Sequence, residues 1–140
     1  MKMIFVNLPV ADLARARAIY EALGFTNNPH FTDKTAAAMV WSDAIFVMLL
    51  AHEKWQGFTT RPIAAPGSSE VSLAITVDSR AEVDALVAAG AAAGGTADAN
   101  PPEDHGLMYQ RTLLDPDGHI WEPFWMDTTL AAGATNVADH

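Results

Sequence analysis

Residues 5–25, FVNLPVADLARARAIYEALGF, predict one strand followed by one helix. The segment opens with a short β-rich run that ends near Pro9, a residue confined to strand ends and edges. Asp12 is a good helix cap, apolar side chains then recur at helical spacing, and Gly24 ends the run. A strand and a helix joined by so short a connection are the start of a compact α/β unit.

Three further β-like segments follow that helix. They cover residues 25–32, 36–41 and 44–50, and turn-forming pairs separate them. We expect them to form an antiparallel meander. The first part of the chain therefore has the order strand, helix, strand, strand, strand.

The same pattern restarts after a Gly- and Pro-rich stretch at residues 52–69, which predicts a linker with one helical turn around Lys54. A strand at 71–77 leads to a capping box at Ser79 and Glu82, which opens an Ala-rich helix. Three more strand-like segments then follow, at residues 96–99, 107–114 and 119–125, and the turn Asp115-Pro116-Asp117-Gly118 joins the last two.

Two offsets align the copies, 67 residues for the first strand and helix cap and 74 residues for the last strand. An internal repeat fixes an architecture more firmly than any single element. We therefore predict one α+β domain over residues 1–140, built from two tandem βαβββ modules that form cupped mixed sheets around a shared cleft. Its parts are module one at 1–51, the linker at 52–69, module two at 70–127 and a loose tail at 128–140.

Composition narrows the possible partners and locations. At 140 residues one core suffices, and a net charge of −9 would repel a phosphate backbone, so nucleic acid is a poor partner. No apolar run approaches the roughly 18 to 20 residues that span a bilayer, and no signal peptide is visible, so we expect a cytoplasmic protein without a membrane partner. The absence of Cys excludes thiolate chemistry and disulfides.

Two stretches carry a family resemblance. FVNLPVADL at 5–13, continued by AIYEALGF at 18–25, resembles the first strand and helix of the glyoxalase/bleomycin-resistance/extradiol-dioxygenase superfamily, also called the vicinal oxygen chelate fold. LDPDGHIWE at 114–122 is similar to the family's hairpin and last strand. The resemblance implies cupped sheets, a ligand cleft and, in many members, a homodimer. It does not select one activity, since members include isomerases, oxygenases and drug-binding proteins.

Metal-using members place four ligands at equivalent points of the first and last strand of each module. The offsets put these positions at Phe5, Met48, Ser72 and Glu122. A phenyl ring cannot donate, and a thioether is a poor ligand for hard ions. We therefore expect a pocket with no metal and no cofactor. The five His residues fall in loops, at turns or at the chain end, without metal-ligand pairing, although His52 with Trp41 and Trp55 leaves room for a binding role near the linker.

Strand alternation indicates which side chains share a face with Glu122. If Arg111 pairs opposite Glu122, then Tyr109 and Leu113 join that face along with Ile120 and Phe124. The pocket would be mostly apolar and aromatic, which suits a small organic ligand. The predicted catalytic residues are Glu122, Tyr109 and Arg111, and the predicted ligand-binding residues are Phe5, Asn7, Phe46, Met48, Ser72, Thr76 and Phe124.

Three hypotheses about function stay open at this point. The first is metal-independent binding of a small organic molecule in a dimeric cleft, as in bleomycin-resistance proteins. The second is a lyase or isomerase of the lactoylglutathione-lyase type, with Glu122 as general base and Tyr109 or Arg111 steadying negative charge. The third is an accessory module without a ligand. Glu122 could also merely pair with Arg111 across the hairpin, and Phe5, Phe46 and Met48 could simply pack in the core.

Overall fold

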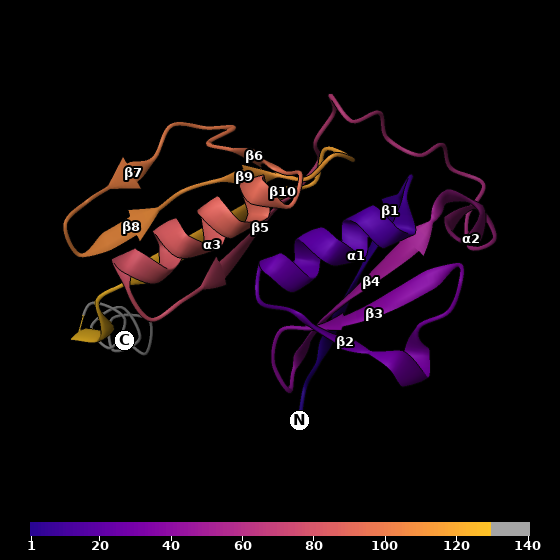
Figure 1. Cartoon of the computed structure of the whole chain (residues 1–140), viewed down its shortest axis with the longest axis horizontal. Helices are drawn as coiled ribbons and strands as arrows, with labels where there is room; N and C mark the ends of the chain where they lie inside the picture. The colour runs from indigo at the N-terminus through magenta and orange to yellow at the C-terminus, as the bar shows by residue number, and fades with distance from the viewer. Residues whose placement is uncertain (130–140) are drawn as a thin grey trace, which may run out of the picture.

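The computed structural model describes residues 1–129 and has the predicted α+β composition (Figure 1). Within these residues no helix is both long and apolar enough to cross a membrane. The elements of the first half are β1 (Ile4–Val10), α1 (Leu13–Ala22), β2 (Thr26–Asn28), the 3-10 turn η1 (Pro29–Phe31), β3 (Ala36–Val40), β4 (Ile45–Ala51) and α2 (His52–Gln56). Those of the second half are β5 (Ser72–Thr76), α3 (Arg80–Ala92), β6 (Thr96–Ala97), β7 (Glu103–Asp104), β8 (Met108–Gln110), β9 (Leu113–Leu114) and β10 (Ile120–Met126).

Both predicted helix starts are present. The Asp12 side chain accepts a hydrogen bond from the backbone N–H of Arg15 at 3.0 Å, which caps α1. Ser79 accepts from the N–H of Glu82 at 3.1 Å, and the Glu82 carboxylate accepts from the N–H of Asp78 at 2.8 Å. These two bonds form a variant of the capping box predicted for α3, in which Glu82 reaches the N–H of the residue before the cap.

The strands form two mixed sheets. In the first, the order is β1-β4-β3-β2, with β1 and β4 parallel and the other pairs antiparallel. In the second, β10 pairs with β5 in parallel and with β8 and β9 in antiparallel fashion, while β6 and β7 extend the sheet at its margins. Each sheet therefore has one pair of parallel strands that lie far apart in the sequence, with β1 and β5 each paired to a single neighbour.

The register of these parallel pairs matches between the sheets. Asn7 lies opposite Met48 in the first, and Ala74 lies opposite Glu122 in the second. The offsets of 67 and 74 residues therefore relate the two parallel ladders residue by residue. The four positions compared with metal-ligand positions occupy matching places on these ladders.

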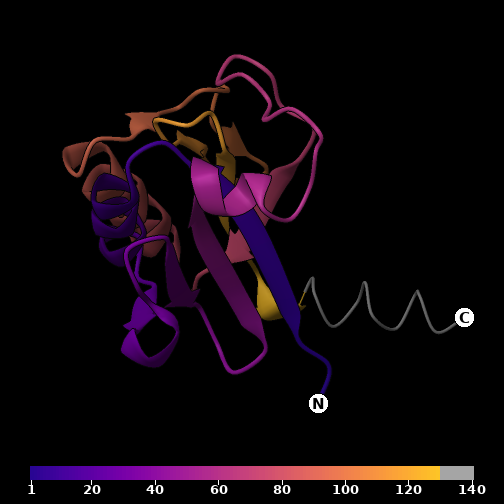
Figure 2. The ribbon, with the colours of Figure 1, turned by 90° about the vertical axis from the view of Figure 1, so that its right-hand side faces the viewer.

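Helices α1 and α3 contact each other and lie on the same side of the two sheets, which extend next to one another (Figures 1 and 2). One core joins the modules, and its centre is aromatic: Tyr20 contacts both Phe25 and Trp121 edge to face. The Tyr20 hydroxyl donates to Asp115 Oδ2 at 2.7 Å and accepts from Trp121 Nε1 at 2.9 Å. This buried chain of hydrogen bonds ties module one to module two.

Two strand predictions differ from the structure. The strand expected at 25–32 stops at Asn28, because Pro29 starts η1 and the Asn28 side chain caps that turn. The strand expected at 107–114 is divided into β8 and β9, with Arg111 and Thr112 between them. Of the predicted tail, residues 130–140 lie outside the described part of the chain.

Candidate functional site

The side of the sheets that faces away from α1 and α3 carries most of the predicted ligand-binding residues. In β1, Leu8 and Val10 are buried in the core, so Phe5 and Asn7 point to the opposite side. The Phe5 ring stacks on that of Phe46, with centroids 4.6 Å apart, and Phe5 is nevertheless 54% exposed. An apolar ring on the edge strand β1 therefore remains accessible on this side.

The second sheet presents its predicted residues on the same side. Trp121 and Pro123 of β10 are buried, so Glu122 and Phe124 alternate away from the core. On β5 the core residue Ile75 likewise places its neighbours on the opposite side. We call this surface the open face and define it by Phe5, Asn7, Phe46, Met48, Ser72, Thr76, Glu122 and Phe124.

Tyr109 and Arg111 do not share the open face, because the assumed pairing of Arg111 with Glu122 is wrong. Tyr109 lies opposite Trp125, and the Arg111 N–H donates to the Pro123 carbonyl at 3.2 Å. A shift of one residue moves every side chain of a strand to the other side of the sheet. Leu113, opposite Trp121, is displaced from the face of Glu122 for the same reason.

The cause of the shift is the length of the turn. Asp115 and His119 are paired, because the Asp115 N–H donates to the His119 carbonyl at 3.0 Å. The loop therefore has three residues, Pro116 to Gly118, instead of the four that the sequence suggested. Asp115 Oδ1 stabilises this shape by accepting from the N–H groups of Asp117 and His119, and Gly118 supplies the positive φ of 89° that such loops require.

On the helix side, Tyr109 and Arg111 are held by carboxylates. The Tyr109 hydroxyl donates to Asp84 Oδ1 at 2.6 Å, and Arg111 forms ion pairs with Asp84 and Asp98 at 2.9 and 2.8 Å. The hydrogen bond to Asp84 raises the pKa of Tyr109 above its ordinary value. The hydrogen bond to Asp98 raises the pKa of Arg111 further above its already high value. Both groups keep their protons and fasten β8 to α3.

Glu122 remains on the open face without the arginine expected opposite it. It is half-buried, and among residues 1–129 no side chain forms an ion pair or hydrogen bond with its carboxylate. The alternative in which Glu122 and Arg111 pair across the hairpin is therefore wrong.

The four positions compared with metal-ligand positions all lie on the open face, where the sheets present a phenyl ring, a thioether, a hydroxyl and a carboxylate. This donor set does not fit a hard or borderline cation, which needs several imidazole or oxygen ligands. Within residues 1–129, no three His, Asp or Glu side chains are grouped as metal ligands would be.

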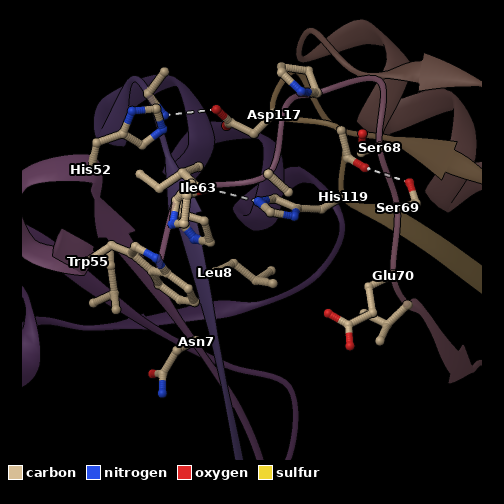
Figure 3. Close-up of a pocket in the computed structure, with 18 of the residues that line it drawn as sticks. Asn7, Leu8, His52, Trp55, Ile63, Ser68, Ser69, Glu70, Asp117 and His119 are labelled. Carbon is tan, nitrogen blue, oxygen red and sulfur yellow. Dashed lines mark hydrogen bonds between the residues drawn. The ribbon is translucent and has the colours of Figure 1, made fainter. Parts of the chain in front are cut away.

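A cavity of about 770 Å³ lies at one end of the sheets, under the linker (Figure 3). Both modules line it, and of the predicted site residues Asn7 alone does so. We call it the roofed pocket; its walls come from β1, α2, the linker, the start of β5 and the hairpin tip. The lining includes Asn7, Leu8, Pro9, Arg15, Leu50, His52, Trp55, Phe58, Arg61, Ile63, Pro66, Ser69, Glu70, Pro116, Asp117, His119 and Ile120. Trp55 and Phe58, large apolar residues in an otherwise linker-like stretch, were the available signal for it.

Comparisons with known proteins agree with this fold. The model of the bleomycin resistance protein-like N-terminal family matches residues 2–42. A hypothetical protein from S. aureus shares 25% identity, with 89% of this chain and 94% of that chain covered and a TM-score of 0.75. A glyoxalase/bleomycin resistance protein from Albidiferax ferrireducens T118 shares 25% identity over 86% and 95% of the two chains, with a TM-score of 0.66.

A bleomycin-binding protein in complex with bleomycin has a TM-score of 0.59 and 22% identity, over 91% of this chain and all (100%) of that chain. A search of curated proteins gives no match. The repeat, the paired mixed sheets and these matches show that the chain has the glyoxalase/bleomycin-resistance fold, and the family match over residues 2–42 supports the superfamily that the two sequence motifs predicted.

Proposed function

We propose that the protein binds a small organic molecule on its open face without the help of a metal. The observation that carries this proposal is the stacked pair of Phe5 and Phe46 on β1 and β4, beside Asn7 and Met48, with Phe5 54% exposed. Exposed aromatic surface with a few polar groups nearby is what ligand sites use for affinity and orientation. The bleomycin-binding relative, which holds its ligand on the same fold, is consistent with this function.

A second copy of the chain would turn the open face into a cleft. Met3, just before β1, is 55% exposed and Phe5 is 54% exposed, so a single chain leaves these apolar side chains in water. We propose a homodimer in which these residues are covered and the ligand lies between the copies. The cytoplasmic location predicted from the sequence belongs to the same proposal.

The test is a thermal-shift screen of small aromatic and aliphatic compounds against protein treated with EDTA. Binding to the folded form raises the unfolding temperature. We expect hits whose stabilisation does not change when EDTA is removed and divalent ions are restored. Because a carboxylate in place of an aromatic ring removes the stacking surface, Phe5→Glu should abolish the shifts caused by uncharged hits.

Phe31→Glu is the matched control. Phe31 is 69% exposed in η1, outside the open face, and the substitution introduces the same charge. It should keep every shift of the wild type. Stoichiometric zinc, nickel, manganese or iron in protein purified without chelator, with hits that depend on it, would contradict metal-independent binding.

A second candidate function is a lyase or isomerase with Glu122 as general base. The observation that favours it is the half-buried Glu122 carboxylate on the open face, without an arginine or hydrogen-bonding partner among residues 1–129. Such a group could take a proton from a carbon next to a carbonyl. Tyr109 and Arg111 would not assist, since both lie on the helix side.

Glu122→Gln separates the two functions. For an enzyme acting on a thiol adduct such as the hemithioacetal of methylglyoxal and glutathione, this isosteric change should abolish turnover and leave ligand binding within a few fold. Turnover that survives the substitution would eliminate Glu122 as the base. Binding without measurable turnover in the wild type would favour the first function.

A further inference from the structure

We propose that the roofed pocket is a second binding site, separate from the open face, and that it takes an organic anion with a flat apolar body. Its volume of about 770 Å³ lies in the range of small-molecule sites, roughly 300–1,000 Å³. Glu122 and the stacked Phe5 and Phe46 do not line it. Occupation of the pocket and of the open face are therefore separate events, with Asn7 at the boundary between them.

The apolar part of the pocket suits a ring system. Trp55 of α2 and Ile63 of the linker lie in the lining (Figure 3). Phe58, just after α2, and Leu50 line the pocket with them. Tryptophan and phenylalanine present large, stiff surfaces that stack on flat ligands. A compact aromatic body would be enclosed on several sides by these residues.

Cationic side chains stand out in the pocket of an otherwise acidic protein. Among residues 1–129 the arginine ion pairs are formed by Arg17, Arg80 and Arg111, whereas Arg15 and Arg61, both in the pocket lining, form none. A guanidinium binds carboxylate and phosphate oxygens through two parallel hydrogen bonds. With a net charge of −9, the protein would repel an anion elsewhere, so the two arginines specify where one can be held.

The two acidic residues of the lining, Asp117 and Glu70, form no ion pair with either arginine among residues 1–129. Asp117 Oδ1 accepts a hydrogen bond from the Ala11 N–H at 2.8 Å, which holds this carboxylate at the backbone after β1. Glu70 lies across the pocket from His52 (Figure 3). His119 is fixed as well, because its Nε2 carries a proton that it donates to the Pro9 carbonyl at 2.8 Å.

The indole nitrogen of Trp55 is an independent observation that favours a ligand with hydrogen-bond acceptors. This nitrogen, Nε1, is buried and has no hydrogen-bond partner among the described residues. An unsatisfied buried donor costs about 1–3 kcal/mol, and native structures contain few of them. The oxygens of an organic anion are acceptors of the required kind. Since the nitrogen is itself covered, the ligand reaches it when the covering side chains move aside.

One close contact holds the linker, residues 52–69, over the pocket. Gly118 at the hairpin tip approaches the Pro66 backbone so closely that a Cβ on Gly118 would lie 2.1 Å from the Pro66 carbonyl oxygen. Ser69 Oγ also donates to the Gly118 carbonyl at 3.5 Å. The linker is therefore held over the pocket by the same turn that provides Asp117 and His119.

The test uses isothermal titration calorimetry with 2-naphthoate, its uncharged analogue 2-naphthamide, and inorganic phosphate. We expect one naphthoate per chain, at least about tenfold weaker binding of the amide, and no measurable binding of phosphate, which lacks the apolar body. The double variant Arg15→Gln with Arg61→Gln should weaken naphthoate binding at least about tenfold and leave amide binding unchanged. Lys2→Gln, outside the pocket, removes one positive charge as each of those substitutions does and should keep naphthoate affinity within about twofold.

Naphthoate that binds the double variant as tightly as the wild type would overturn the proposal, as would naphthoate and naphthamide binding equally well. Absence of saturable naphthoate binding up to millimolar concentration would overturn it too. Circular dichroism and urea unfolding of each variant check that the fold is kept. Since neither arginine lies on the open face, the uncharged hits of the EDTA-treated thermal-shift screen that Phe5→Glu abolishes should be the same for the double variant, so that failure of one proposal does not resemble failure of the other.

Discussion

The roofed pocket and the open face are built on the same strands and differ in what covers them. β1, β5 and β10 contribute residues to both, yet the pocket is closed by the linker while the open face leaves Phe5 54% exposed. The repeat explains the open face, since it gives matching parallel ladders in both sheets. It does not explain the pocket, because the linker occurs once in the chain. The open face thus follows from the repeated modules, whereas the roofed pocket depends on the linker, which is not repeated.

The largest effect is expected from a substitution that disturbs the contact between the linker and the hairpin tip. Gly118→Ala places a methyl group against the Pro66 backbone and forces alanine into a positive φ of 89°. Gly106→Ala forces a similar φ of 79°, but no atom lies within 4 Å of the added methyl. We expect Gly106→Ala to lower the free energy of unfolding by about 1 kcal/mol and Gly118→Ala by at least about twice that.

Naphthoate titration separates the roof from general stability. Gly118→Ala should weaken naphthoate binding at least about tenfold, which corresponds to about 1.4 kcal/mol, while Gly106→Ala leaves it unchanged. Urea unfolding and calorimetry supply the two measurements. Equal losses of stability and affinity in both variants would show that the contact with Pro66 does not hold the roof.

A smaller effect comes from the pH dependence of the turn beside the pocket. Burial raises the pKa of Asp115 above its ordinary value, and its hydrogen bonds from Tyr20 and the turn only partly oppose this. A raised folded-state pKa means that the stabilising contribution is fully present below the unfolded-state pKa and is lost as pH rises through the folded-state pKa. Asp115→Asn has no charge to bury, so its stability relative to wild type should increase as pH rises through the carboxyl range.

Urea unfolding of wild type and Asp115→Asn at several pH values between about 3 and 7 measures this difference. A difference in unfolding free energy that stays constant with pH would contradict the assignment. The exposed Asp104 provides a contrast, since the hydrogen bond from Arg80 lowers its pKa to about 2. Its contribution has the opposite sign and is lost as pH falls below the ordinary carboxyl range towards 2.

The smallest effect is expected at Tyr109. Tyr109→Phe removes one largely exposed hydrogen bond to Asp84 on the helix side of the sheet. We expect a loss of less than about 1 kcal/mol in unfolding free energy, and unchanged binding at both the roofed pocket and the open face. A substantial loss of ligand binding or turnover in this variant would show that Tyr109 contributes to the site. It would contradict the register, which places Tyr109 on the helix side of the sheet.

The sequence was sufficient where local rules act. The caps at Asp12 and Ser79, the repeat offsets and the family motifs all follow from residue type and spacing, and the structure and comparisons agree with them. It failed at the turn after β9, because the side-chain hydrogen bonds of Asp115 shorten the loop by one residue and so reverse the side of Tyr109 and Arg111. Periodicity cannot reveal such a bond.

The roofed pocket could not have been predicted for a related reason. Gly and Pro mark residues 52–69 as a linker but do not say where it lies, and its position depends on the long-range approach of Pro66 to Gly118. The sequence indicates a binding role for Trp55 and His52, which lie near the linker. Arg15 lies in the first predicted helix, where its residue type and spacing do not indicate a binding role. The other residues that line the pocket come from separate parts of the chain.

A crystallographic fragment screen of EDTA-treated protein tests the central claim most directly, namely that two separate regions bind ligands without a metal. Neutral aromatic fragments should occupy the open face beside Phe5 and Glu122, and aromatic carboxylates should occupy the roofed pocket with their carboxylate near Arg15 or Arg61. Fragments of both classes in a single region, or binding that returns only when a metal ion is supplied to Glu122, would contradict the account.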